Sequence, residues 1–220
     1  AGAGGVGGMG GVGGAPPAGI VSDDFSSGTL NTHLWTVVDP QMDGTAEVMN
    51  EALELSVPSG QAHDPWTPEN TSLRVMQTAA NEDFSIEVKF NSAPTVGQVN
   101  QIQGILVQQD LSNYIRFDAY SDGTTLSVFS AALIDDAPQQ PVPVNEQVAI
   151  TPLFLRLTRI GDQFTVEYSD DGSTYIEPTG SPFTQALTVS AVGVFAGNAG
   201  MDPAHTAVVD YFRNVTQTGP

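Results

Sequence analysis

The sequence predicts an all-β protein: a two-sheet antiparallel jelly-roll sandwich with an extended glycine-rich arm at its N-terminus. Strand-like segments recur at intervals of about 8–12 residues between turn residues, and no helical periodicity lasts longer than two turns. Residues 114–120 alternate strictly between polar and apolar types, which indicates a strand with one buried face. A chain of 220 residues suits one such sandwich, which we place over residues 20–220.

The arm, residues 1–19, repeats the triplet Gly-Gly-X, with Val6, Met9, Val12 and Ala15 at the X positions. A period of three matches the polyproline II helix, which would place these four side chains on one ridge. Because glycine loses more backbone entropy on ordering than any other residue, an ordered arm needs a docking surface. We therefore expect an assembly arm that docks on the sandwich or on a neighbouring copy; the alternative is a flexible linker.

The elements follow in order along the domain. Asn50-Glu51, Asp122-Gly123 and Gly161-Asp162 are expected to turn the chain between neighbouring strands. The proline-rich residues 135–143 predict a surface loop. In residues 114–120, Ile115 and Phe117 are expected to face the core and Arg116 and Asp118 to lie outside. The predicted strands are 21–25, 34–38, 47–50, 52–57, 72–78, 83–90, 102–108, 114–120, 124–133, 153–160, 163–168, 188–195 and 206–212.

Composition excludes several classes of partner. Six Lys and Arg stand against 25 Asp and Glu, a formal charge of -19, which repels nucleic acid and anionic membranes. No apolar run is long enough to span a bilayer. The chain has no cysteine, so disulfides and thiolate metal sites are excluded. Because it begins at Ala1, as an exported protein does after signal removal, we expect an extracellular or cell-surface location.

Several motifs resemble a known family: HDPW at 63–66, GILVQQD at 104–110, YIRFDAYSDG at 114–123 and FAGNAG at 195–200. They are similar to the concanavalin A-like lectin/glucanase superfamily, and more narrowly to laminin-G-like jelly-roll modules of bacterial secreted proteins. The resemblance covers roughly residues 20–215. It implies a curved two-sheet sandwich that often binds carbohydrate and sometimes carries calcium.

Catalysis is not expected. Glucanases of the superfamily that the motifs resemble carry paired carboxylates in an E-x-D-x-x-E strand motif, which this sequence lacks. Glu87 and Glu167 each lie alone on a strand and are interpreted as solvated surface residues. The three histidines are too scattered to predict a catalytic cluster.

Two binding sites are predicted. One combines a stacking aromatic with planar polar groups, as sugar sites do; the alternative is that Trp66 caps the sandwich while His63 and Arg74 tie loop carbonyls. Its residues are His63, Asp64, Trp66, Asn70 and Arg74, with Gln103 and Asn198 on the same surface. The other site is structural Ca²⁺ on Asp23, Asp24 and Asp210, which pairing of the terminal strands would bring together; otherwise Asp24 caps a turn and the others face water.

For function, the sequence favours a non-enzymatic extracellular structural subunit that self-assembles with other copies of itself into a filament or surface array through its arm. The alternative is a carbohydrate-binding, lectin-like module of a secreted protein, with a polysaccharide as partner.

Overall fold

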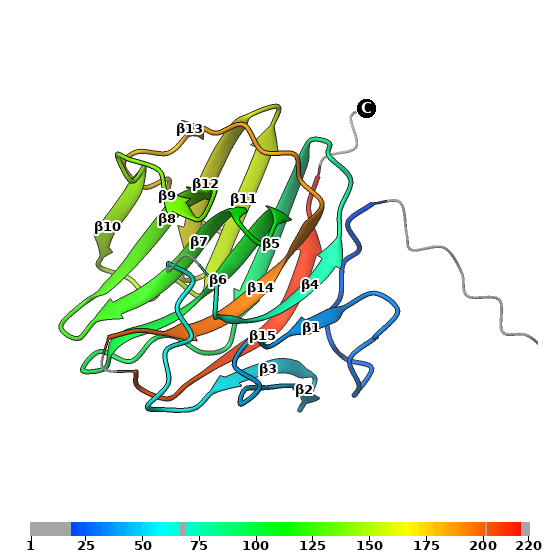
Figure 1. Ribbon diagram of the computed structural model, residues 1–220, viewed down its shortest axis with the longest axis vertical. Coiled ribbons are helices and arrows are strands. Elements are labelled where there is room, and N and C mark those ends of the chain that lie inside the picture. The colour runs from blue at the N-terminus through cyan, green and yellow to red at the C-terminus, as the bar shows by residue number, and fades with distance from the viewer. Residues whose placement is uncertain (1–18, 67–68, 201, 217–220) are drawn as a thin grey trace, which may run out of the picture.

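Two antiparallel sheets pack face to face around one core (Figure 1). The computed structural model describes residues 19–66, 69–200 and 202–216. Val6, Met9, Val12 and Ala15 of the predicted arm lie outside these residues. Among the described residues, no helix is long and apolar enough to cross a membrane.

The eight-stranded sheet has the order β1-β4-β14-β6-β7-β8-β10, with β9 paired to β8. Its longest strands, β6, β7 and β8, lie side by side, and β7 contains the alternating residues 114–120. The strands are β1 (Thr36–Val38), β4 (Leu73–Thr78), β6 (Val99–Asp110), β7 (Asn113–Asp122), β8 (Leu126–Ile134), β9 (Ala137–Pro138), β10 (Val144–Val148) and β14 (Ala191–Asn198).

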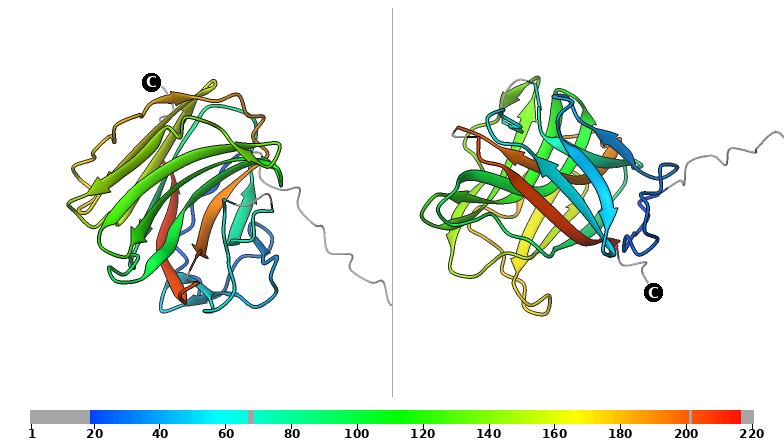
Figure 2. Two further views of the ribbon diagram at one scale, coloured as in Figure 1. Left: turned by 60° about the vertical axis from the view of Figure 1, so that its left-hand side comes forward. Right: turned by 90° about the horizontal axis from the view of Figure 1, so that it is seen from below.

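The seven-stranded sheet has the order β13-β12-β11-β5-β15-β3-β2. In both sheets the strands curve around the common core (Figure 2). The strands are β2 (Thr45–Met49), β3 (Ala52–Val57), β5 (Phe84–Phe90), β11 (Phe154–Ile160), β12 (Gln163–Ser169), β13 (Phe183–Thr184) and β15 (His205–Asn214).

The inner faces of the two sheets supply the core. Ile115 and Phe117 of β7 are fully buried there, as the alternation predicts. At one end Trp35 packs its ring edge against Phe212 with centroids 5.3 Å apart, and its indole N–H donates to Asp23 at 2.8 Å. Burial of such a core is the main stabilising contribution, at about 25 cal/mol per Å² of apolar surface.

The predicted jelly-roll sandwich is confirmed, and its local errors have physical reasons. Asn50 and Glu51 both adopt positive φ, at 50° and 61°, and close the predicted hairpin between β2 and β3. Residues 21–25 form only an isolated bridge, between Asp23 and Phe212, instead of a strand. Strand β10 was not predicted, because only its two ends are apolar and it pairs at the edge of the sheet with β8 alone.

Candidate functional site

The outer face of the eight-stranded sheet carries an apolar cluster that is buried although no second sheet lies over it. The loop between β3 and β4 provides the cover: the Tyr114 hydroxyl donates to the Pro65 carbonyl at 3.0 Å, and Trp66 packs against the cluster. Part of the face is therefore closed by this loop, and only the remainder can receive a ligand. The buried members of the cluster are Met76, Ile102, Leu106, Tyr114, Leu133 and Phe195.

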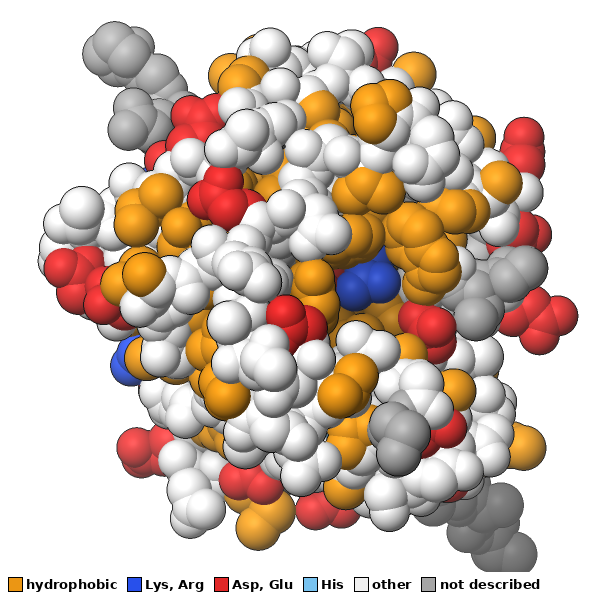
Figure 3. All heavy atoms as spheres, turned by 90° about the vertical axis from the view of Figure 1, so that its left-hand side faces the viewer, with side chains coloured by type: hydrophobic (Ala, Val, Ile, Leu, Met, Phe, Trp, Pro, Cys, Tyr) orange, Lys and Arg blue, Asp and Glu red, His pale blue; other side chains and the backbone are white. Residues whose placement is uncertain are grey.

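The open part is a hollow of about 410 Å³. Figure 3 shows it as a depression with basic side-chain atoms at its base, hydrophobic side chains around it and acidic side chains at its border. Its volume lies within the range of small-molecule sites, about 300–1,000 Å³. We call it the outer-face pocket; its lining is Asp64, Trp66, Asn100, Ile102, Arg116, Tyr120, Phe129, Val142, Asn145 and Ala199.

Three aromatic side chains form one wall of the outer-face pocket. The Trp66 and Phe129 rings meet edge to face with centroids 5.6 Å apart, and Tyr120 meets Phe129 edge to face at 6.2 Å. The Tyr120 hydroxyl donates to the Asn145 side-chain oxygen at 2.9 Å, which ties β7 to β10. In an edge-to-face pair the edge of one ring meets the face of the other, so the first ring keeps its planar surface for other contacts, such as the apolar face of a sugar.

A buried ion pair forms the floor. Arg116 donates two hydrogen bonds to the Asp118 carboxylate, at 2.7 and 2.9 Å, and its guanidinium carbon lies 4.9 Å from the centre of the Phe129 ring. Arg116 is 4% exposed and Asp118 is fully buried. Burial raises the pKa of Asp118, and the attraction of Arg116 opposes that rise. Because a buried guanidinium needs a counter-charge, we expect the pair to be ionised at neutral pH.

Gly104 of β6 makes room for this floor. It pairs directly with Asp118, and a Cβ at this position would collide with the Phe117 carbonyl and with the Asp118 side chain. The close approach of the two strands under the ion pair therefore requires a residue without a side chain.

Asp64 adds a carboxylate to the rim. One of its oxygens accepts the Trp66 N–H at 2.8 Å, and its own N–H donates to the Thr71 hydroxyl at 2.8 Å, so the loop holds it in place. Burial raises the pKa of Asp64, while the Trp66 N–H and the charge of Arg116 lower it.

Of the seven residues predicted for a sugar site, only Asp64 and Trp66 line the outer-face pocket. His63 is fully buried; its Nε2 lies 2.8 Å from Asp43, and its Nδ1 lies 3.1 Å from the Gln61 carbonyl. The Asn198 side-chain oxygen accepts a hydrogen bond from the backbone N–H of His63 at 2.7 Å, and its amide nitrogen donates to two loop carbonyls. His63 and Asn198 thus brace the loop that presents Asp64 and Trp66, so their placement in the binding surface was wrong.

Arg74, Asn70 and Gln103 also lie outside the pocket. Arg74 is 2% exposed and donates to the Asn70 and Ser72 carbonyls at 3.1 Å, which matches the structural alternative. Asn70 binds Ser72 and lines a separate hollow with Arg74. Gln103 projects to the core side, where it joins Ser92 and His205, because it has the same strand parity as the buried Ile105.

The predicted calcium ligands do not converge. The segment around Asp23 does pair with β15, but Asp23 accepts hydrogen bonds from Phe25 and Trp35, and Asp24 accepts them from Ser26. Asp210 binds Lys89 at 3.0 Å instead. Each carboxylate has its own partners, so pairing of the chain ends does not build the predicted site.

Among the described residues, one group has metal-ligand spacing: Asp39, Asp43 and His63, whose ligand atoms lie within 4.8 Å of one another. Both Asp39 oxygens accept backbone N–H groups, from Met42 and Gly44. The group therefore has a structural explanation in the loop that leads into β2.

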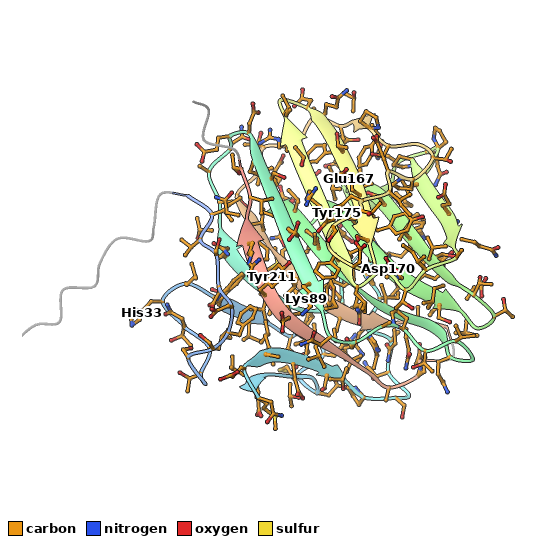
Figure 4. All side chains as sticks on the ribbon, turned by 180° about the vertical axis from the view of Figure 1, so that it is seen from behind. His33, Lys89, Glu167, Asp170, Tyr175 and Tyr211 are labelled. Atoms are coloured by element: carbon orange, nitrogen blue, oxygen red, sulfur yellow. The ribbon has the colours of Figure 1, made fainter. Side chains whose placement is uncertain are left out.

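The outer face of the seven-stranded sheet carries a different cluster. Glu87 accepts hydrogen bonds from Arg156, Tyr175 and Tyr211 at 2.7–2.8 Å and is 8% exposed, so its interpretation as a solvated residue was wrong. Figure 4 shows Tyr175 and Tyr211 on this face together with Glu167, which lies 3.6 Å from Arg156. A nearby hollow of about 530 Å³ is lined by charged and hydroxyl groups, and its one aromatic residue, Phe84, is 3% exposed.

The site that sequence reasoning missed consists of Arg116, Tyr120, Phe129 and Asn145. The strict alternation of residues 114–120 did place Arg116 and Tyr120 on one face of a central strand, and that was the available signal. They share a pocket with Trp66 only because the loop between β3 and β4 brings Trp66 onto this face of the sheet, where it contacts Phe129. No periodicity in the sequence reveals this arrangement.

Comparison with known families gives an assignment. The model of the family described as the beta xylosidase C-terminal concanavalin A-like domain matches residues 22–214. The chain belongs to this family. The match covers almost all of the described sandwich, so the predicted superfamily is confirmed. A search of curated protein sequences found no match.

Several solved structures have a similar fold. The GH43 protein BlXynB from Bacillus licheniformis has a TM-score of 0.70 at 19% identity, over 89% of this chain and 39% of that one. A xylan beta-1,4-xylosidase from Bacillus halodurans has a TM-score of 0.65 at 15% identity, over 88% and 38%. SCLam, an endo-beta-1,3(4)-glucanase, has a TM-score of 0.58 at 11% identity, over 91% and 92%. At such identities the likeness shows the fold alone, and the chain spans about two fifths of the first two proteins.

Membership of the xylosidase C-terminal domain family corrects the functional prediction. The expectation of a filament or array subunit is wrong, because the family model that matches the chain describes a C-terminal domain of beta xylosidases. The expectation rested on the glycine-rich arm, which lies outside both the family match and the described residues. The lectin-like alternative fits the family better.

Proposed function

We propose that this chain is a non-catalytic carbohydrate-binding domain that holds a short segment of a sugar chain in the outer-face pocket. The observation that carries the proposal is the arrangement of Trp66, Tyr120 and Phe129 beside Arg116 and Asp64. Sugar sites need an aromatic surface for the apolar face of the ring and planar polar groups for its hydroxyls. The family, named for xylosidases, makes plant cell-wall pentose chains the first ligands to test.

The shape of the pocket supports a short segment. Trp66 and Asp64 bound it on the side of the β3–β4 loop, Val142 and Asn145 bound it at β10, and Ala199 bounds it at the end of β14. We infer that a hollow of about 410 Å³, lined by segments from three parts of the chain, takes the end or a short branch of a sugar chain and not the middle of a long polymer.

The state of the carboxylates at the outer-face pocket supports a role in binding without catalysis. Glycoside hydrolysis normally requires two carboxyl groups on either side of the scissile bond. The carboxyl groups at the outer-face pocket are Asp64 and, below its floor, Asp118. Both oxygens of Asp118 accept hydrogen bonds from Arg116, and the side chain is fully buried. Asp118 is therefore not placed to attack or protonate a sugar, and we infer that the domain binds without cleaving.

Calorimetric titration with xylo- and arabino-oligosaccharides, beginning from a glycan array, tests the proposal. Trp66→Ala should weaken binding at least about tenfold, because it removes the aromatic surface. Tyr175→Ala, on the outer face of the other sheet, is the matched control and should leave affinity unchanged. If no glycan binds above background, or if Trp66→Ala binds as well as wild type, the proposal is wrong.

We infer an extracellular location, because a polymer ligand of the cell wall is met outside the cell. A structural Ca²⁺ is not favoured by the separated positions of Asp23, Asp24 and Asp210.

A further inference from the structure

The charges around the outer-face pocket are unequal. Arg116 is the one basic residue in its lining, Asp64 lies on the rim, and Asp118 lies under the floor. One positive charge therefore faces two negative ones. A ligand entering the pocket meets a net negative local field.

Arg116 is not free to bind an anionic ligand. Its Nε and one terminal nitrogen donate to the two oxygens of Asp118 at 2.7 and 2.9 Å. This edge of the guanidinium is therefore not available for a bidentate hydrogen bond to a ligand carboxylate. Its guanidinium carbon also lies 4.9 and 5.8 Å from the centres of the Phe129 and Phe195 rings. These contacts hold the Arg116 side chain in place at the floor of the pocket.

No other Lys or Arg in the described part of the chain lines the outer-face pocket. Arg74, on the same sheet, is 2% exposed and donates to the Asn70 and Ser72 carbonyls. The chain has six Lys and Arg against 25 Asp and Glu. Lys89 and Arg156, which are half-buried, lie in ion pairs on the seven-stranded sheet, on the opposite side of the molecule. The long-range field around the domain therefore adds to the local repulsion of anions.

We propose that the outer-face pocket selects uncharged sugars and rejects uronic acids, with Asp118 acting as the residue that masks Arg116. This selectivity rests on the proposed carbohydrate-binding function. The pocket keeps the hydrogen-bonding capacity of a guanidinium for hydroxyl groups while cancelling its charge. A carboxylate at the C6 position of a sugar would meet the negative charges of Asp64 and Asp118, and the charge of Arg116 is already balanced by Asp118.

The test compares gluco-configured oligosaccharides of one length in three forms: with a C6 hydroxymethyl group, as the uronic acid, and as the methyl ester of the uronic acid. Xylo-oligosaccharides serve as a neutral reference. Titrations are run at low salt and in about 0.5 M NaCl, where the field of distant charges is screened but contacts inside the pocket persist. We expect the ester to bind at least about tenfold more tightly than the acid under both conditions.

Asp118→Asn keeps the shape of the floor and removes its negative charge. This variant should bind the acid more tightly than wild type does and narrow the difference between acid and ester. Asp64→Asn, on the rim, should also narrow the difference in affinity between acid and ester without disturbing the floor. It replaces Asp118→Asn in the test if that variant does not fold.

The outcomes separate the two proposals. If no oligosaccharide of any kind binds, the carbohydrate-binding function is wrong, and so is the proposed selectivity, which depends on it. If neutral xylo-oligosaccharides bind but wild type does not distinguish acid from ester, the function stands and the selectivity is overturned. A difference that disappears in high salt also overturns it, because the discrimination would then come from the overall charge and not from the pocket.

Discussion

Removing either partner of the Arg116–Asp118 pair should lower the free energy of unfolding, and only one of the two losses should depend on pH. Asp118→Leu leaves a guanidinium that is 4% exposed without its counter-charge. Loss of one partner of a buried pair costs about 3–5 kcal/mol of the free energy of unfolding. We expect about 3 kcal/mol, because Arg116 still contacts the Phe129 ring at 4.9 Å and faces the hollow. Arginine keeps its proton from pH 7 to pH 5, so this cost should not change with acidification.

Arg116→Met leaves Asp118 buried and unpaired, which should cost a similar amount at pH 7. Burial already raises the pKa of Asp118, and the loss of Arg116 removes the attraction that opposes the rise. A carboxyl whose folded pKa lies above its unfolded value binds more protons when folded, so lowering the pH stabilises the variant relative to wild type. At 1.36 kcal/mol per pH unit, up to about 2.7 kcal/mol should return between pH 7 and pH 5.

Urea unfolding followed by tryptophan fluorescence at both pH values measures these costs. The double variant Arg116→Met/Asp118→Leu is the control and should be less destabilised than the sum of the single variants, because neither charge is then left alone. The reasoning is refuted if the cost of Arg116→Met is the same at pH 5 and pH 7, or if both single variants cost less than about 1 kcal/mol.

Three further predictions concern the stability of the sandwich. Burial lowers the pKa of His205 to about 4; since this is below the unfolded value of about 6.5, the stabilisation is complete above pH 6.5 and about 3 kcal/mol is lost as the pH falls to 4. His205→Gln should lose less stability over that range in urea unfolding, and an equal loss would contradict this. Gly104→Ala should lower the free energy of unfolding by about 1–3 kcal/mol, because its Cβ meets the Phe117 carbonyl; an unchanged melting temperature would contradict it. Asp43→Ala should lower the free energy of unfolding by about 1–3 kcal/mol, because it leaves the buried His63 Nε2 unpaired, and Asp43→Asn should cost less; an unchanged free energy of unfolding in Asp43→Ala would contradict this.

The fold was largely predictable because its signals are local. The alternation around Ile115 and Phe117 and the turn at Asn50-Glu51 depend on neighbouring residues, and both appear as expected. Strand alternation also carried information that the site prediction did not use. Gln103 lies two residues from the core residue Ile105 on the same strand, so both side chains point to the core side.

The candidate site was only partly predictable because it depends on contacts between distant segments. Trp66 and Asp64 were identified from their local composition, whereas Phe129 joins them only because the β3–β4 loop crosses three strands of the sheet. Arg116 was expected to be solvated, since an outward-facing residue on a sandwich normally meets water. The covering loop and Asp118 bury it instead.

The most direct test of the account uses the two tryptophans of the chain. Trp35 is 1% exposed, with its indole N–H bonded to Asp23, whereas Trp66 lines the outer-face pocket. In a ¹H–¹⁵N spectrum, titration with a neutral oligosaccharide should move the indole signal of Trp66 in a saturable way and leave that of Trp35 in place. A spectrum in which binding leaves Trp66 unmoved, while signals from the seven-stranded sheet shift, would contradict the account.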